Sequence, residues 1–367
     1  MTQTLESTAR RPRQPELDYL KTVAIFLMVS QHAIEVLANF DSEEVPPSGF
    51  FQHLTEFSWE FLCAIIFIFS IGFGLAYTRK KKPQQLAWRG LRLLRDAYLL
   101  NIARGVLPPL LVWMVKGEID PNQIITGLFT VDVLHFAAVS YFFVALLKQF
   151  RVSKYAFFPI SAVMLFIVYL IEPTLEGIGG QFLAIPLSFF FYCGGISYFP
   201  LFDYFVFLVI GMLVGEFLSD SDLSDRFYII LFWYSLTIFV GIYLTMKISG
   251  VPFSRYYDMT AMVDNSDFGK LIMHVLVLLG EFAFFHFVHK SLKKGEKVRG
   301  FVRFCGTNLT TVYIIHWIII CWLAALMQIV DIQGGNFETT MLISVAITMV
   351  SLGIAKMKQK GIFHTYH

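Results

Sequence analysis

The sequence predicts an all-α polytopic membrane protein, a bundle of about ten membrane-spanning helices with both termini in the cytoplasm. Three observations lead to this class: 56% of the 367 residues are hydrophobic, only 15% are charged, and the mean hydropathy is +0.63. Soluble globular proteins carry about 25% charged residues. The formal net charge of +2 leaves no basic surface for nucleic acid. These values exclude a soluble two-domain enzyme, a disordered chain and a nucleic-acid-binding protein.

A helix that crosses a bilayer needs about 20 mostly apolar residues. Such runs predict spans at 18–39, 55–78, 96–115, 124–147, 155–172, 199–218, 227–249, 269–290, 307–330 and 338–356. The apolar stretch 181–198 is interrupted by Pro186 and by Gly194 and Gly195, so we place it as an extracytoplasmic re-entrant or interfacial segment. The chain 1–367 is then one transmembrane domain, with cytoplasmic tails at 1–16 and 357–367 and no internal repeat.

Cationic residues give the predicted orientation, because cytoplasmic loops of membrane proteins are enriched in Lys and Arg. Ten spans and a cytoplasmic N-terminus place the cation-rich segments inside, at 10–13, 79–95, 148–154, 290–303 and 356–360. An eleventh span at 181–198 would move the cluster at 293–303 outside. The loop 219–226 is an exception, because it is acidic although it is predicted to lie inside.

Cysteines and glycines carry no recognisable chemical motif. The four cysteines, at positions 63, 193, 305 and 321, lie in or beside apolar runs without metal-binding or disulfide spacing, and we expect buried thiols. No cleavable signal peptide is expected, since the N-terminal residues are polar. No phosphate-binding glycine loop is present. Packing between helices is the expected role of the paired glycines Gly72, Gly74, Gly211 and Gly215.

The first span, ELDYLKTVAIFLMVSQHAIEVLA, carries ionisable residues, which are functional candidates when they lie inside a membrane. Lys21 and His32 are eleven residues apart, about three turns, and share a helix face. Glu35 follows His32 by one turn, and a carboxylate at this spacing can orient the imidazole of a general base. Alternatively, Asp18 and Lys21 form an interfacial ion pair and His32 bonds to a neighbouring helix. His53, before the second span, is either part of the same outer site or a solvated loop residue.

An inner basic cluster precedes the third span. Arg89, Arg92 and Arg95 are spaced i, i+3 and i+6 along one edge of a short amphipathic helix. Arginine suits bidentate contacts with phosphate, whereas ordinary charge in contact with lipid headgroups is the alternative. Arg104 lies deeper, inside the third span, where a cation needs a partner or a water-filled cavity.

Other polar residues fall within later spans. Asp132 and His135 are three residues apart in TVDVLHF, and GTNLTTVYIIHW contains Asn308, Tyr313 and His316. They either line the site or make structural hydrogen bonds. Asp203 is placed towards the outer side, and the histidines at 274, 286 and 289 are expected at the ends of the eighth span. No metal site is expected.

An inner cationic site and an outer histidine–carboxylate site suit group transfer across the membrane. Acetyl-CoA fits as a cytosolic donor, because its phosphates match the arginines and its slender pantetheine arm can reach inward. The imidazole would deprotonate an acceptor hydroxyl or amine, or carry the acyl group itself.

Several segments resemble the transmembrane acyltransferase superfamily, which includes the acyltransferase-3 and the heparan-alpha-glucosaminide N-acetyltransferase-like proteins. The spacing of Lys21 and His32 is similar to the basic residue, ten residues and histidine of acyltransferase-3 proteins. The Arg-x-x-Arg run at 89–92 resembles their inner motif. Their late segment G-x-N-S-L-x-x-Y-x-x-H resembles GTNLTTVYIIHW, which matches at Gly306, Asn308, Tyr313 and His316.

SYFPLFDYFVFLVIGMLVG and VDVLHFAAVSYFF resemble spans of the glucosaminide branch, and His53 lies where that branch has its catalytic histidine. Asp203 stands where a proline is common, and the S-V-E-x-Q-F-Y segment of many acyltransferase-3 proteins is missing. These departures favour the glucosaminide-like branch or an unclassified one.

The resemblance implies an acyl-CoA-dependent O- or N-acyltransferase that moves an acyl group, expected to be acetyl, to a hydroxyl or amine of an extracytoplasmic glycan or glycolipid. The expected roles are His32 as base, Glu35 as its orienting carboxylate and Lys21 at the thioester; His53 stays open as the base. The expected donor-binding residues are Arg89, Arg92, Arg95 and Arg104.

Acetyl-CoA is expected as a co-substrate, with no permanently bound cofactor. Membrane lipids are the further partners, and the oligomeric state stays open. The short loops favour a bacterial cytoplasmic membrane. A polysaccharide or lipid exporter is the main alternative function, and a sensory or scaffold protein is a third.

Overall fold

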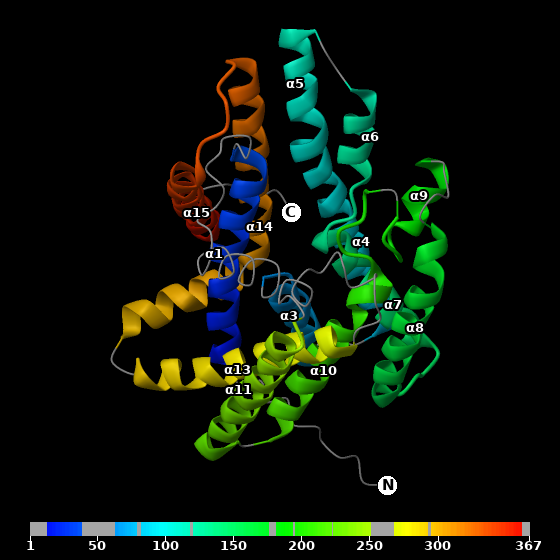
Figure 1. The fold of residues 1–367 in the computed structure, drawn as a ribbon, viewed down its shortest axis with the longest axis vertical. Helices are drawn as coiled ribbons and strands as arrows, with labels where there is room; N and C mark the ends of the chain where they lie inside the picture. The colour runs from blue at the N-terminus through cyan, green and yellow to red at the C-terminus, as the bar shows by residue number, and fades with distance from the viewer. Residues whose placement is uncertain are drawn as a thin grey trace.

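A computed structural model of the protein describes residues 13–38, 63–78, 82–117, 120–175, 181–193, 195–221, 223–250, 268–292 and 295–361. These residues are mostly helical and contain no strand, only isolated bridges between Ala38 and Gly335 and between Val131 and Ser197. The helices are α1 (Pro15–Leu37), α3 (Ala64–Tyr77), α4 (Pro83–Asn101), the π-helical turn η2 (Ile102–Val106), α5 (Leu107–Lys116), α6 (Pro121–Phe129), α7 (Val133–Gln149), the 3-10 turn η3 (Lys154–Ala156), α8 (Phe157–Leu175), α9 (Gln181–Leu187), α10 (Leu201–Asp220), α11 (Asp225–Ile248), α13 (Phe268–Ser291), α14 (Glu296–Ile329) and α15 (Phe337–Gln359). Figure 1 shows these helices packed as a bundle, which confirms the predicted all-α class.

Within the described residues, 8 helices are long and apolar enough to cross a membrane. The two predicted spans that are not among them, 55–78 and 124–147, fall on the shorter apolar helices α3 and α7. Residues 55–62 of the first of these lie outside the described part. In its described residues, 181–193 and 195–198, the broken apolar stretch forms the short helix α9 and irregular backbone, as its Pro186 and Gly195 predict.

Helix α1 packs mainly against α14 and α15, and Figure 1 shows α1 and α14 side by side. Gly306 of α14 makes this contact possible, because a Cβ at this position would lie 2.4 Å from Oδ1 of Asp18. Asp18 is buried and accepts hydrogen bonds from Nε of Arg13 at 2.6 Å and from Nη2 of Arg13 at 2.8 Å. The ion pair considered for Asp18 and Lys21 is thus made with Arg13 instead.

Helices α3 and α10 approach each other closely through two glycines. A Cβ on Gly72 would lie 1.9 Å from the carbonyl oxygen of Leu208, and one on Gly211 would lie 2.2 Å from that of Phe69. Their predicted packing role is confirmed, because membrane helices use small residues where backbones touch. The same prediction is wrong for Gly74, since nothing lies within 4 Å of its Cβ position.

The predicted amphipathic helix and the third span form one continuous helix, Pro83–Lys116, rather than two elements. The π-helical turn η2 interrupts its regular hydrogen bonding around Arg104. Gly105 in this turn packs against Gly127 of α6, where a Cβ on Gly105 would lie 2.6 Å from the Gly127 carbonyl oxygen. Single π-helical turns inside α-helices are frequent at functional sites.

The predicted span 124–147 is also corrected, because it consists of α6 and α7 with a non-helical break at 130–132. Other segments satisfy the backbone at this break. The N–H of Val131 donates to the Ile196 carbonyl at 2.7 Å, and Nδ2 of Asn101 donates to the carbonyls of Leu128 at 2.9 Å and Thr130 at 2.8 Å. Irregular backbone at membrane depth requires hydrogen-bond partners of this kind, and α4 and the segment after α9 supply them here.

Contacts between chain segments identify the two ends of the bundle. The Lys116 end contains the C-terminal ends of α1, α5 and α14: the Gly335 N–H donates to the Leu37 carbonyl at 3.0 Å, and Lys116 lies 2.6 Å from Asp331. The Glu16 end contains the first turns of α1 and α11 and the last turn of α13.

Candidate active site

The two backbone irregularities bring Arg104 and Asp132 together. Nη2 of Arg104 lies 2.5 Å from Oδ2 of Asp132, and both side chains are buried. Nη2 of Arg104 also donates to Oδ1 of Asn101 at 3.2 Å. Two buried charges lose their hydration, so such a pair needs close geometry and additional hydrogen bonds. The predicted need of Arg104 for a partner at this depth is met by a carboxylate.

Asp132 receives further donors. The backbone N–H of Val133 donates to its Oδ1 at 2.6 Å, and the phenol of Tyr313 on α14 donates to its Oδ2. Asp132 also caps the N-terminus of α7. The carboxylate therefore connects η2, the beginning of α7 and α14 at one buried point.

An aromatic ring joins this ion pair to His32. Cζ of Arg104 lies 4.4 Å from the centroid of the Trp317 ring, and the centroid of the His32 ring lies 4.1 Å from that of Trp317. His32, Trp317, Arg104, Asp132 and Tyr313 thus follow one another in contact, and we call them the central row. The row connects α1, α14, η2 and the helix break.

His32 forms the predicted pair with Glu35. Its Nδ1 lies 3.0 Å from Oε2 of Glu35, while Oε1 of Glu35 accepts a hydrogen bond from Nε2 of Gln31 at 3.0 Å. A carboxylate only accepts, so Nδ1 carries the proton and Nε2 of the neutral ring keeps a lone pair. The His32 side chain is 21% exposed and that of Glu35 is 51% exposed, whereas that of Arg104 is only 8% exposed. The accessible part of the central row is therefore its histidine end.

Two further histidines flank the central row and are held in opposite tautomers. Nδ1 of His316 donates to the Val312 carbonyl at 3.0 Å, so its Nε2 carries a lone pair. Nδ1 of His135 accepts from the Asp132 N–H at 3.3 Å, so its Nε2 carries the proton. Among the described residues neither Nε2 has a hydrogen-bond partner. The ring of His316 also stacks on that of His32 at 5.5 Å.

Two other predicted site residues of the described part, Lys21 and Asn308, lie away from His32. Lys21 precedes His32 by eleven residues of α1, about 16 Å along the axis. Asn308 donates to the Phe304 carbonyl of its own helix at 2.9 Å and lies two turns before His316. His53 lies outside the described residues. The roles given to these three residues stay predictions.

The three arginines of α4 differ in their surroundings. Cζ of Arg89 lies 4.7 Å from the ring centroid of Tyr141, and Arg95 pairs with Asp96 at 2.7 Å. Arg92 is exposed, and no hydrogen bond or ion pair ties it to another described residue. Arg89 lies about 22 Å along the helix axis from Arg104. The exposed arginines and the central row are therefore separate parts of the molecule.

Trp317 and Asn101 contact the ion pair but were not among the predicted site residues. Trp317 directly follows His316 in the segment GTNLTTVYIIHW, but its contacts come from helices distant in sequence. Asn101 is a buried polar residue inside an otherwise apolar stretch. A polar residue within a predicted span is the pattern that made Arg104 a candidate, so the same pattern could have identified Asn101.

A second charged cluster lies at the Glu16 end. Nδ1 of His286 lies 2.8 Å from Oε1 of Glu16, and Nε2 of His286 lies 3.0 Å from Oδ1 of Asp225, which also pairs with Lys290. Both ring nitrogens of His286 therefore face carboxylate oxygens, one from α1 and one from α11. Asp225 belongs to the acidic loop 219–226, and its pairing with α13 shows how charge in that loop is compensated.

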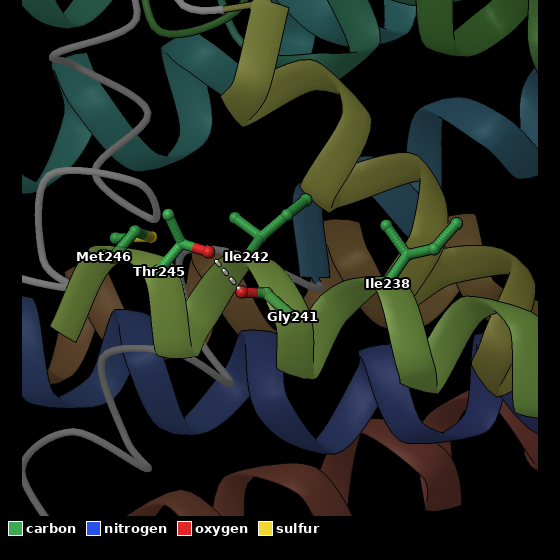
Figure 2. Close-up of a pocket in the computed structure, with 5 residues that line it drawn as sticks. All are labelled: Ile238, Gly241, Ile242, Thr245 and Met246. Carbon is green, nitrogen blue, oxygen red and sulfur yellow. Dashed lines mark hydrogen bonds between the residues drawn. The ribbon is translucent and has the colours of Figure 1, made fainter. Parts of the chain in front are cut away.

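A shallow apolar groove runs along α11, away from the central row. Figure 2 shows the residues that line it, and the hydroxyl of Thr245 is bonded to the Gly241 carbonyl at 2.9 Å. The lining residues are Ile238, Gly241, Ile242, Thr245 and Met246. It offers no group for acid–base chemistry. Within the described part of the chain, no cluster of histidine, cysteine and acidic residues is suited to hold a metal ion.

Comparison with known proteins gives one match. A family model described as "Heparan-alpha-glucosaminide N-acetyltransferase, catalytic" matches residues 13–241, more than half of the chain. This range includes His32, Glu35, Arg104 and Asp132, but it ends before α14 and its Tyr313 and Trp317. No curated protein and no solved structure matches the chain.

Proposed function

Because this chain belongs to the family of heparan-alpha-glucosaminide N-acetyltransferase catalytic domains, we propose that it moves an acetyl group from cytosolic acetyl-CoA to a hydroxyl or amine of a glycan or glycolipid across the membrane. The family is one of membrane acetyltransferases. The geometry of the central row supports the assignment of His32 and Glu35 as acting residues.

The observation that carries the proposal is the pair of His32 and Glu35 at 3.0 Å, in a partly exposed position at the end of a buried charged row. With Nδ1 bonded to Glu35, Nε2 of His32 is free to take a proton from the acceptor. The acceptor oxygen or nitrogen then attacks the thioester carbon, a C–O or C–N bond forms and the C–S bond breaks. His32 returns the proton to the departing CoA thiolate.

The rest of the central row holds the pair in place and supplies a fixed dipole. Because Arg104 is bound to Asp132, we propose that it contributes to the electrostatic field of the site. Its direct contact with the donor stays a prediction. Asp132 compensates the charge of Arg104, so the pair supplies an oriented dipole, and preorganised dipoles stabilise charge that develops during acyl transfer. Lys21 lies about 16 Å along α1 from His32, so its role at the thioester is not part of the proposal with His32 as the base. His53 as an alternative base remains the role that the family resemblance implies.

For the donor phosphates, Arg89 and Arg92 are better placed than Arg95. Asp96 already compensates the charge of Arg95, whereas both other guanidinium groups are exposed and free of carboxylate partners within the described residues. The separation of about 22 Å between Arg89 and Arg104 requires an elongated donor. Acetyl-CoA has this form, with its phosphates at one end and its thioester at the other.

The test uses purified protein in detergent, with acetyl-CoA as donor and a glucosaminide that carries a free amine as acceptor probe. CoA release and the mass of the acetylated sugar are measured for the wild type, for His32→Ala and for His289→Gln, a control histidine near the Glu16 end. We expect transfer by the wild type, a loss of about 10²–10⁴-fold in His32→Ala and little change in the control.

Each other outcome has a definite meaning. Full activity in His32→Ala together with inactive His53→Ala would make His53 the base and overturn the role of His32. A well-folded wild type that neither binds nor consumes acetyl-CoA or longer acyl-CoA would overturn the proposed function.

A further inference from the structure

Trp317 occupies a position between a fixed cation and the proposed base. One side of its ring faces Cζ of Arg104 at 4.4 Å, and His32 lies against it at 4.1 Å between centroids with a tilt of 32°. Arg104 and His32 make no hydrogen bond to each other, so within the described residues the indole provides the contact between them.

The Arg104 side of this contact is held firmly. Arg104 is buried and bonded to Asp132 and Asn101, and its backbone lies in the π-helical turn. Trp322, one turn beyond Trp317 on α14, donates from Nε1 to the Ala103 carbonyl of the same turn at 2.9 Å. This bond fixes the position of α14 against η2, and Trp317 therefore lies on a rigid support.

The His32 side has little support of its own. The hydrogen bond of His32 goes to Glu35, which is half exposed and lies on the same helix. A hydrogen bond to a half-exposed carboxylate holds geometry weakly, because water competes for that carboxylate. The ring also meets His316 at 5.5 Å, so its placement relative to the rest of the bundle depends on two aromatic residues of α14.

We propose that Trp317 is a positioning residue that sets the orientation of the His32 imidazole relative to Arg104 and Asp132. This inference rests on the proposed function, in which His32 acts as the base. Trp317 touches neither donor nor acceptor in this role. It acts because a base must stand within hydrogen-bond reach of the proton it removes, and a small displacement of the ring lowers the rate.

The kinetic test compares Trp317→Leu, which keeps an apolar side chain but removes the flat ring, with Trp317→Phe, which restores a ring. We expect kcat to fall by about 10–100-fold in Trp317→Leu and by less than about threefold in Trp317→Phe, with the KM for acetyl-CoA changed less than about twofold in both. Trp233→Leu is the matched control, because Trp233 is an exposed tryptophan of α11.

A readout that needs no turnover is the fluorescence of Trp317. A protonated imidazole in contact with an indole quenches its emission, and the chain has 6 tryptophans, so the Trp317 signal is taken as wild type minus Trp317→Phe. We expect the Trp317 emission of the wild type to fall as the pH is lowered. In His32→Gln we expect this emission to be independent of pH. Glu35, Arg104, Asp132 and His316 also face this region and stay unchanged in the comparison.

The outcomes separate the two proposals. An inactive wild type overturns the proposed function. An active wild type whose folded Trp317→Leu variant keeps its kcat, or whose Trp317→Phe variant is as slow as Trp317→Leu, overturns the role of Trp317 alone. A pH dependence of the Trp317 signal that persists in His32→Gln also contradicts the inference, since another group would then be the neighbour of the indole.

Discussion

Arg104 and Asp132 meet at two irregularities of the helical backbone, a π-helical turn in one segment and a break between two helices in the next, with 2.5 Å between Nη2 and Oδ2. Each irregularity alone disturbs regular hydrogen bonding in an apolar region. Together they place a cation opposite an anion, and the amide of Asn101 satisfies carbonyls at the break. The ion pair and the irregular backbone therefore stabilise each other.

Breaking this pair is expected to destabilise the fold strongly. Arg104→Met or Asp132→Asn alone should lower the free energy of unfolding by about 3–5 kcal/mol. The first variant leaves the buried Asp132 carboxylate without its cation, and the second leaves the buried Arg104 guanidinium without its anion. The double variant should recover part of this loss. Denaturant unfolding in detergent gives all three values, and Lys116→Met, which removes an exposed pair worth about 0–1 kcal/mol, is the control. Single variants no less stable than this control would contradict the prediction.

Gly306→Ala should disturb the packing of α1 on α14. The new methyl group would lie 2.4 Å from Oδ1 of Asp18, so the carboxylate must shift away from Arg13. We expect a loss of about 1–3 kcal/mol, measured as a lower thermal midpoint. Gly353→Ala on α15 is the matched control, because nothing lies within 4 Å of its Cβ position and alanine favours a helix. Equal midpoints for both variants would show that Asp18 does not fill this space.

His286→Gln should loosen the Glu16 end. The substitution removes the imidazole that bridges Glu16 and Asp225 and leaves the buried Glu16 carboxylate without its partner. We expect a loss of about 1–3 kcal/mol in the free energy of unfolding. Adding Glu16→Gln should restore part of it, since the unpaired carboxylate is then gone. If the double variant is less stable than His286→Gln, the two side chains do not act as a pair.

Donor binding should depend on Arg89 and Arg92 more than on Arg95. Calorimetry with acetyl-CoA is expected to show binding weakened at least about tenfold in the double variant Arg89→Ala/Arg92→Ala, because two charge-assisted contacts to phosphate are lost. Arg95→Ala should change the affinity by less than about threefold, since Asp96 already compensates this charge. Arg299→Ala provides a control cation on α14. Unchanged affinity in the double variant would move the phosphate site elsewhere.

The spans could be predicted from sequence because length and hydropathy are properties of a continuous segment. The breaks within the spans could not be predicted, because their hydrogen-bond partners lie far away in the sequence. At the break 130–132, these partners are the carbonyl of Ile196 and the side-chain amide of Asn101. Asp132 is in retrospect the local sign of this break: its short polar side chain bonds to nearby backbone and competes with a continuous helix.

The same distinction applies to the site. His32 and Glu35 are one turn apart on one helix, so their pairing follows from spacing alone. The contact between Trp317 and His32 depends on how far α14 is shifted along α1, which Gly306 and the Trp322 hydrogen bond determine through packing. Apolar patterns place a ring on a helix face, but they do not specify which residue of a neighbouring helix it meets.

The central row draws members from both sides of residue 241, where the family similarity ends. A chain trimmed to the matched residues would keep Arg104 and Asp132 but lose the phenol that bonds to the carboxylate and the indole that covers the guanidinium. Lipid would then replace α14 beside a buried ion pair. The boundary of sequence similarity is therefore not the boundary of an autonomous folding unit, and proteins related through the first part alone can differ in what packs against the histidine of α1.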